Sequence, residues 1–114
     1  MPHFVIDCSP SVLTKQPAAD ILRAVHEVAD ASGVFNVADI KVRIREYDHY
    51  IVAGERSDFI HVFANILEGR TVEKKAALSR AIVERLVEIF PDVPAISINI
   101  REFERATYMN RGLL

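Results

Sequence analysis

The chain has 114 residues, half of them apolar and about a quarter charged, which is the size and composition of one globular domain. The formal net charge is −2 without a basic block, which argues against a nucleic-acid-binding protein, and no apolar run approaches the roughly 20 residues that cross a bilayer. One cysteine excludes an internal disulfide, and the first residues do not form a signal peptide, so we expect a single cytoplasmic domain over residues 1–114.

The first half of the chain predicts a strand, a helix and a second strand. Residues 2–8 form a short apolar run that is typical of a buried strand. From Pro17, which the first helical turn tolerates, apolar residues recur at helical spacing until Gly33. Residues 40–46 alternate strictly between apolar and charged, with Lys41, Arg43 and Arg45 on one side, and this alternation predicts a strand.

The second half repeats this order. After a turn around Gly54, residues 59–66 form another strand-like run. Thr71 is placed to cap a helix whose apolar positions recur up to Pro91, and residues 95–103 alternate again as a last strand.

These elements predict an α+β fold in which a β-α-β unit occurs twice. Because a helix between parallel strands crosses over with one hand, we expect a four-stranded mixed sheet with both helices on one face. The other face then carries the cations of residues 40–46. We also expect Phe4, Ile60 and Val62 to remain uncovered and, since a two-layer fold with a bare face is seldom complete, to promote self-association.

Several kinds of chemistry lack their motifs. The four histidines show no spacing typical of a metal site, and no GxSxG motif or glycine-rich phosphate loop is present, so we expect neither a metal nor a cofactor. Cys8 ends an apolar strand and is expected to pack in the core rather than to act as a nucleophile.

Pro2 is the unusual residue. Removal of Met1 would give it a free secondary amine, and a free α-amino group has a pKa of about 7.7–8.0. A partly apolar pocket and nearby cations would lower that pKa, so that the neutral amine could act as a general base. On position alone, the interpretation that Pro2 is simply a common second residue would be favoured over a catalytic role.

A family resemblance favours the catalytic interpretation. The opening MPHFVIDCS, the stretch SGVFNVADIKVR and the stretch HVFANILEGRTVEKK are similar to the 5-carboxymethyl-2-hydroxymuconate delta-isomerase family of the tautomerase superfamily. The resemblance covers nearly the whole chain. It implies a homotrimer that needs no cofactor and uses the amino-terminal proline as catalytic base.

Three further residues are implied by the resemblance. Arg70, in the Gly69–Arg70 junction before the second long helix, matches a catalytic arginine that binds a substrate carboxylate. Arg43 matches the second arginine of a family strand and would bind substrate. Lys41 stands where the family has the first arginine, and lysine keeps the charge but loses the planar fork that grips a carboxylate with two hydrogen bonds.

The implied activity is the isomerisation of 5-carboxymethyl-2-hydroxymuconate, a tricarboxylate enol, to its 2-oxo-3-ene isomer in homoprotocatechuate degradation. Lys41 leaves open a tautomerase of different specificity, acting on another 2-hydroxydienoate or a phenylpyruvate-like enol. A non-catalytic two-layer module that binds ligands is a third interpretation, because fold does not fix function.

Overall fold

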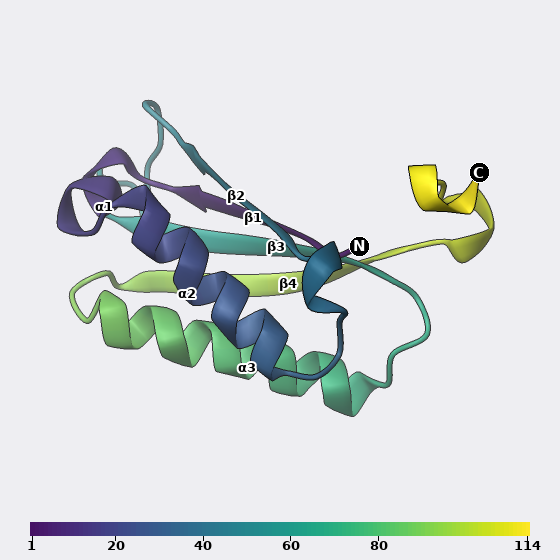
Figure 1. Cartoon of the computed structure of the whole chain (residues 1–114). Helices are drawn as coiled ribbons and strands as arrows, with labels where there is room; N and C mark the ends of the chain where they lie inside the picture. Colours follow the sequence, from purple (N-terminus) through teal and green to yellow (C-terminus); the bar gives the residue numbers. More distant parts are fainter.

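The computed structural model describes all residues, 1–114. Three-residue 3-10 turns lie at Val37–Asp39, Arg105–Thr107 and Arg111–Leu113. No helix is long and apolar enough to span a membrane. The main elements, in chain order (Figure 1), are β1 (His3–Cys8), α1 (Pro10–Lys15), α2 (Ala18–Ala31), β2 (Lys41–Glu46), β3 (Phe59–Leu67), α3 (Val72–Ile89) and β4 (Ala95–Phe103).

The four strands form one mixed sheet in the order β2-β1-β3-β4. β1 and β2 are parallel, β3 and β4 are parallel, and the central pair β1 and β3 is antiparallel. Each parallel pair is joined by a long helix, so the predicted repeat of two β-α-β units in a mixed sheet is confirmed.

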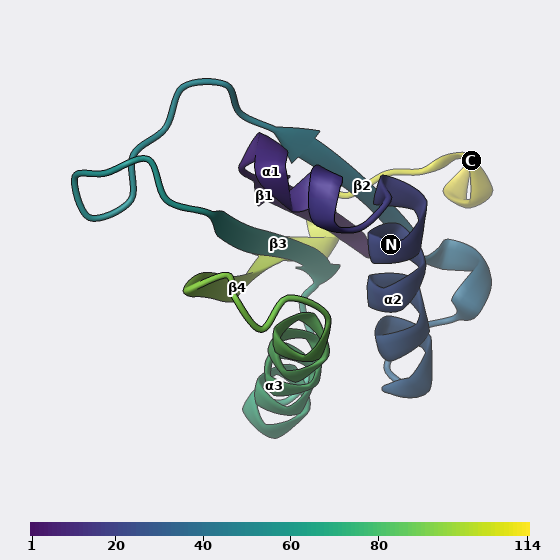
Figure 2. The same ribbon diagram turned by 90° about the vertical axis from the view of Figure 1, so that its left-hand side faces the viewer.

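Both long helices cover the same face of the sheet. Figure 2, turned by 90° from the view of Figure 1, shows α2 and α3 next to each other on the same side of the strands. The buried core lies between the helices and this face, and its strand residues include Phe4, Ile6, Cys8, Ile60, Val62, Ala64 and Ile66.

The expectation that Phe4, Ile60 and Val62 remain uncovered is wrong. Their exposed fractions are 0%, 1% and 0%, because the strand alternation turns them toward the helices. The apolar residues on the open face are instead half-buried ones, among them Val5 and Phe63, which are paired across β1 and β3.

The short helix α1 was not predicted. Its six residues are too few to show a helical period, and only Ser9 followed by Pro10 at the first helical position indicated it. The hydroxyl of Ser9 donates to Asp58 at 3.1 Å, and Asp58 also accepts from Ser11 and pairs with Lys15 at 3.0 Å. The pKa of Asp58 is lowered, first by the Ser11 hydrogen bond and then by those of Lys15 and Ser9, against the opposing effect of burial. Asp58 thus ties α1 to the start of β3.

The chain leaves the sheet after β4. In Figure 1 this carboxyl-terminal segment, drawn in yellow, extends away from the body of the molecule. It exposes the apolar side chains of Met109, Leu113 and Leu114, and its backbone is anchored where the amide of Arg105 donates to Glu68 at 2.6 Å.

Candidate active site

Three chain segments meet at one end of the sheet. β1 and β2 begin there, since His3 pairs with Lys41, and β3 ends there because it runs antiparallel to β1 and its Asn65 pairs with His3. The junction between β3 and α3, which carries Arg70, therefore lies near the amino terminus. The order of strands brings together residues that are far apart in the sequence.

Pro2 is held firmly in this region. Its side chain is less than 2% exposed, and its carbonyl accepts a hydrogen bond from the Lys41 amide at 3.1 Å. The Pro2 nitrogen is an amide as long as Met1 precedes it. Removal of Met1 would expose an amine whose direction is already fixed by the ring and the first strand pair.

Arg70 lies in the turn before α3. Gly69 has a φ of 117°, a conformation that favours glycine, and Thr71 caps the helix by accepting from the Lys74 amide at 3.2 Å. The predicted cap is thereby confirmed. The turn and the cap together fix where the Arg70 side chain leaves the backbone.

The guanidinium of Arg70 is anchored by neutral groups only. It donates to the carbonyls of Leu67 at 3.1 Å and Val34 at 3.3 Å, and it lies 5.3 Å from the ring centre of Phe35. None of the ion pairs of the structure includes Arg70. Its charge and its remaining N–H groups are therefore available to an anion.

The amino terminus lies in a cationic environment. The pKa of the Met1 amino group is lowered, first by burial, then by Lys41 through a hydrogen bond and its charge, and to a smaller degree by Arg70, while Asp39 raises it. Lys41 is itself held by a 2.6 Å hydrogen bond from its ammonium to the Asp39 carbonyl. The charges of both Lys41 and Arg70 therefore act on an amine at this position.

Arg43 lies one step further along the open face. It is opposite Val5 in the strand register, and its Nη1 donates to Nδ1 of His3 at 3.0 Å. The pKa of His3 is lowered, first by burial and then by the charges of Arg43, Lys41 and the amino terminus. The structure thus brings Pro2, Lys41 and Arg70 to one end of the sheet and connects Arg43 to them through His3.

His3, Phe35 and Asp39 were missed in the sequence. His3 could have been found, since it directly follows Pro2 in a strand whose alternation turns its side chain to the open face. Phe35 lies in a connection without a period, and only the tertiary structure places it against Arg70. Asp39 is two residues from Lys41 in the sequence, but no local pattern marked it.

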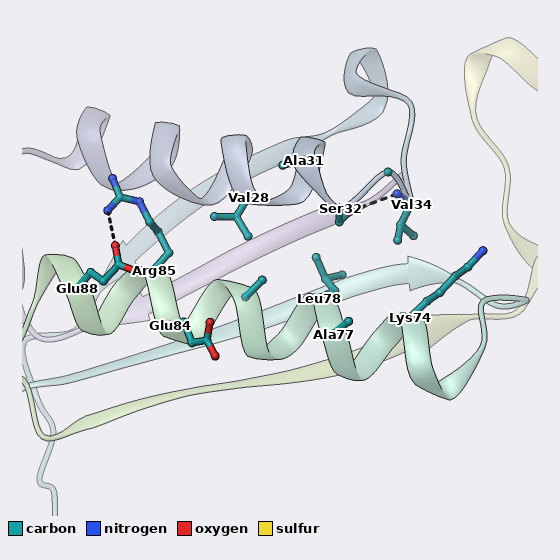
Figure 3. Close-up of a pocket in the computed structure, with 12 residues that line it drawn as sticks. Val28, Ala31, Ser32, Val34, Lys74, Ala77, Leu78, Glu84, Arg85 and Glu88 are labelled. Carbon is teal, nitrogen blue, oxygen red and sulfur yellow. Dashed lines mark hydrogen bonds and ion pairs between the residues drawn. The ribbon is translucent and has the colours of Figure 1, made fainter.

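Other groups do not form a competing site. Cys8 is fully buried, and burial, followed by the charges of Glu46 and Asp7, raises the pKa of its thiol to about 11, which fits the expected core role. No group of three or more His, Cys, Asp and Glu side chains is placed to hold a metal ion. The largest cavity, about 500 Å³, lies between α2 and α3 (Figure 3), and Pro2, Lys41, Arg43 and Arg70 are all absent from its lining.

Comparison with known proteins decides the family. The family model described as 5-carboxymethyl-2-hydroxymuconate isomerase matches residues 2–112. The chain belongs to this family of isomerases. A 5-carboxymethyl-2-hydroxymuconate Delta-isomerase of Escherichia coli is 26% identical to it over 86 residues, which are 74% of this chain and 68% of that protein.

Solved structures show the same fold. A 5-carboxymethyl-2-hydroxymuconate isomerase from Deinococcus radiodurans R1 superimposes with a TM-score of 0.85 at 22% identity, covering 96% of this chain and 88% of that one. A fused 4-OT wild-type symmetric trimer gives a TM-score of 0.81 at 23% identity, covering 96% and 91% of the two chains. The isomerase has the tautomerase fold, and family membership argues against a non-catalytic ligand-binding module.

Proposed function

We propose that this isomerase converts 5-carboxymethyl-2-hydroxymuconate to its 2-oxo-3-ene isomer, in the degradation of homoprotocatechuate, with Pro2 as the general base. The observation that carries the proposal is the meeting of Pro2, Lys41 and Arg70 at one end of the sheet. The family name and the relative from Escherichia coli support the substrate.

Pro2 would act after removal of Met1. The lowered pKa of the Met1 amino group supports a neutral amine here, since burial and the charges of Lys41 and Arg70 disfavour an ammonium ion at this place. Met1 removal would shift the amine by one residue toward the strand. A neutral secondary amine that is held by a buried ring is a suitable base near neutral pH.

The reaction is a proton transfer along a conjugated system. The Pro2 nitrogen takes the proton of the 2-hydroxyl group, the enol oxygen becomes the 2-oxo group, and the double bonds shift toward it. The same proton then returns from nitrogen to the distant carbon C5, which leaves a double bond at carbon 3. Neither an oxidant nor a cofactor enters this balance.

Cations would hold the substrate and stabilise the charge that develops on its oxygens. Arg70 suits the carboxylate and oxo group nearest the base, because its charge has no acidic partner in the protein and its position is fixed by two carbonyls. Lys41 and Arg43, on the strand beside β1, would bind a second carboxylate. A tricarboxylate fits a site with this many cations.

We also propose a cytoplasmic homotrimer of one domain per chain. Three features support assembly: the apolar Val5 and Phe63 of the open face, the exposed apolar residues of the carboxyl-terminal segment, and the fused 4-OT trimer with the same fold. One core, which extends through both β-α-β units, supports the single domain.

The test follows the loss of dienol absorbance with Met1-free protein. We expect Pro2→Ala and Arg70→Ala each to lower kcat/KM at least a hundredfold, while Arg80→Ala, which removes an exposed arginine paired with Glu84 on α3, leaves it unchanged. Protein that retains Met1 should be as inactive as Pro2→Ala. Full activity of Pro2→Ala would contradict the role of base.

Lys41 supports a second candidate, a tautomerase of different specificity. Lysine binds a carboxylate as a point charge and orients it less strictly than arginine. A panel of 2-hydroxydienoates and phenylpyruvate enol, assayed with wild type and Lys41→Arg, separates the two. A preference for the tricarboxylate in both proteins supports the first function; a wild-type preference for a smaller enol supports the second.

A further inference from the structure

His3 links the proposed base to a substrate-binding cation. It directly follows Pro2, and its Nδ1 lies 3.0 Å from Nη1 of Arg43 on the neighbouring strand. We propose that His3 is a positioning residue, whose neutral imidazole holds the Arg43 guanidinium in place for a substrate carboxylate. This inference rests on the proposed function and adds a residue to it.

The contact fixes the state of the imidazole ring. Arginine has N–H donors and no acceptor, so Nδ1 of His3 must be the acceptor. A neutral histidine that accepts at Nδ1 carries its proton at Nε2, whereas a protonated one has no acceptor at all. Protonation of His3 therefore breaks its bond to Arg43 and replaces it with repulsion.

The surroundings of His3 keep it neutral. The charged groups that face it are Arg43 and Lys41 from β2 and the amino terminus, all of them cationic, and β3 presents the uncharged Asn65. The next charge along this row is Arg101 of β4, which pairs with Asn65. With no carboxylate among these groups, a proton on His3 would have no counter-charge.

Arg43 depends on this one contact. It forms no ion pair, and its side chain is exposed on the open face. His3 uses one end of the guanidinium and leaves further N–H groups for a ligand. Without His3 the long side chain would move among several rotamers, and a carboxylate would have to order it on binding.

Three substitutions at His3 test the contact. Asparagine places an amide oxygen near the position of Nδ1, glutamine reaches nearer to that of Nε2, and leucine offers no acceptor. We expect His3→Leu to raise KM for the tricarboxylate about tenfold with a smaller change in kcat, His3→Asn to restore most of the loss, and His3→Gln to restore less.

The pH dependence gives a readout that a merely structural role would not move. In wild type, KM should rise as the pH falls through the pKa of His3, and in His3→Asn this rise should be absent because asparagine does not titrate. NMR titration needs no activity: Arg43→Gln should raise the pKa of His3, since the charge of Arg43 lowers it. His49→Asn, in an exposed loop, is the matched control and should alter neither.

The outcomes separate this inference from the function on which it rests. If Pro2→Ala abolishes activity but all three His3 variants keep the wild-type KM and its pH dependence, the positioning role is wrong and the function stands. An active Pro2→Ala removes the base, while a His3 pKa that does not respond to Arg43→Gln overturns the contact directly.

Discussion

The two faces of the sheet differ in what they contribute. The face under α2 and α3 consists mainly of buried and half-buried aliphatic and aromatic residues. Besides Cys8, its strands carry titratable groups only near their ends, Glu46 of β2 and Glu102 of β4, and Glu102 pairs with Lys75 of α3. The open face carries His3, Lys41, Arg43 and Asp7, with few apolar side chains between them. One face therefore provides the free energy of folding, and the other provides charge.

The chemistry lies where the open face meets the end of the sheet. Buried positions admit charged groups only with partners, whereas strand ends and loops hold them near water. The candidate site takes rigidity from the covered face, through the buried Pro2 and Phe35, and takes its cations from the open face and the turn at Arg70.

Two phenylalanines test the difference between the faces with one kind of substitution. Phe4→Ala, on the covered face, should lower the free energy of unfolding by about 3–5 kcal/mol, because it removes a fully buried ring that packs against Phe35. Phe63→Ala, on the open face, should cost far less in the monomer, since its ring is only half-buried under Arg101. Urea denaturation at low protein concentration measures both.

The same two substitutions also test whether the two faces differ in their contribution to assembly in solution. If the open face is an interface between copies, Phe63→Ala should weaken assembly in sedimentation experiments while Phe4→Ala alters mainly the monomer. Equal losses of monomer stability in the two variants would contradict the distinction between the faces.

The turn that holds Arg70 belongs to neither face and depends on its cap. Thr71→Ala should lower the free energy of unfolding by about 1 kcal/mol, because the Lys74 amide loses its acceptor. Thr71→Ser keeps the hydroxyl and should restore most of this loss. Thr107→Ala, in the exposed carboxyl-terminal segment, is the control, and a cost equal to that of Thr71→Ala would argue against a specific effect of the cap.

On the open face, protonation of His3 should lower the stability of the protein as the pH falls. The pKa of His3 in the folded protein lies below its reference value of 6.5, so the unfolded chain binds the proton more readily and stability falls as the pH drops through and below 6.5. In His3→Asn the fall between pH 8 and pH 5 should be smaller. Denaturation midpoints at the two pH values give the answer, and identical pH slopes would contradict the role of His3.

The smallest expected effect is on the covered face, where the thiol of Cys8 should hardly react with a thiol reagent. Cys8 is 0% exposed and its pKa is raised to about 11, so the native protein should not react with DTNB near neutral pH, while the unfolded protein should release one equivalent. Rapid native labelling would mean that β1 opens readily from the core.

Local pattern made most of the fold predictable. Periodicity predicted the four strands and the two long helices. Thr71 predicted the amino-terminal cap of α3, and Pro91 predicted its end. These signals could be recognised because each lies within a few residues of the feature that it marks. The helix α1 escaped because six residues contain too little period. Phe4 lies two residues before Ile6, so an alternating strand would place both side chains on the same face. On that basis the sequence could have predicted that Phe4 is buried.

The sequence by itself determined the elements, the family resemblance and the residues with unusual chemistry, Pro2 and Arg70 among them. Only the tertiary structure decided that the antiparallel pairing of β1 with β3 brings the Arg70 turn to the amino terminus, and that parallel pairing with β2 sets Arg43 beside His3. The physical reason is the distance along the chain over which each kind of interaction acts. Periodicity and capping act over a few residues, whereas strand pairing and shared charge join positions more than thirty residues apart in the chain.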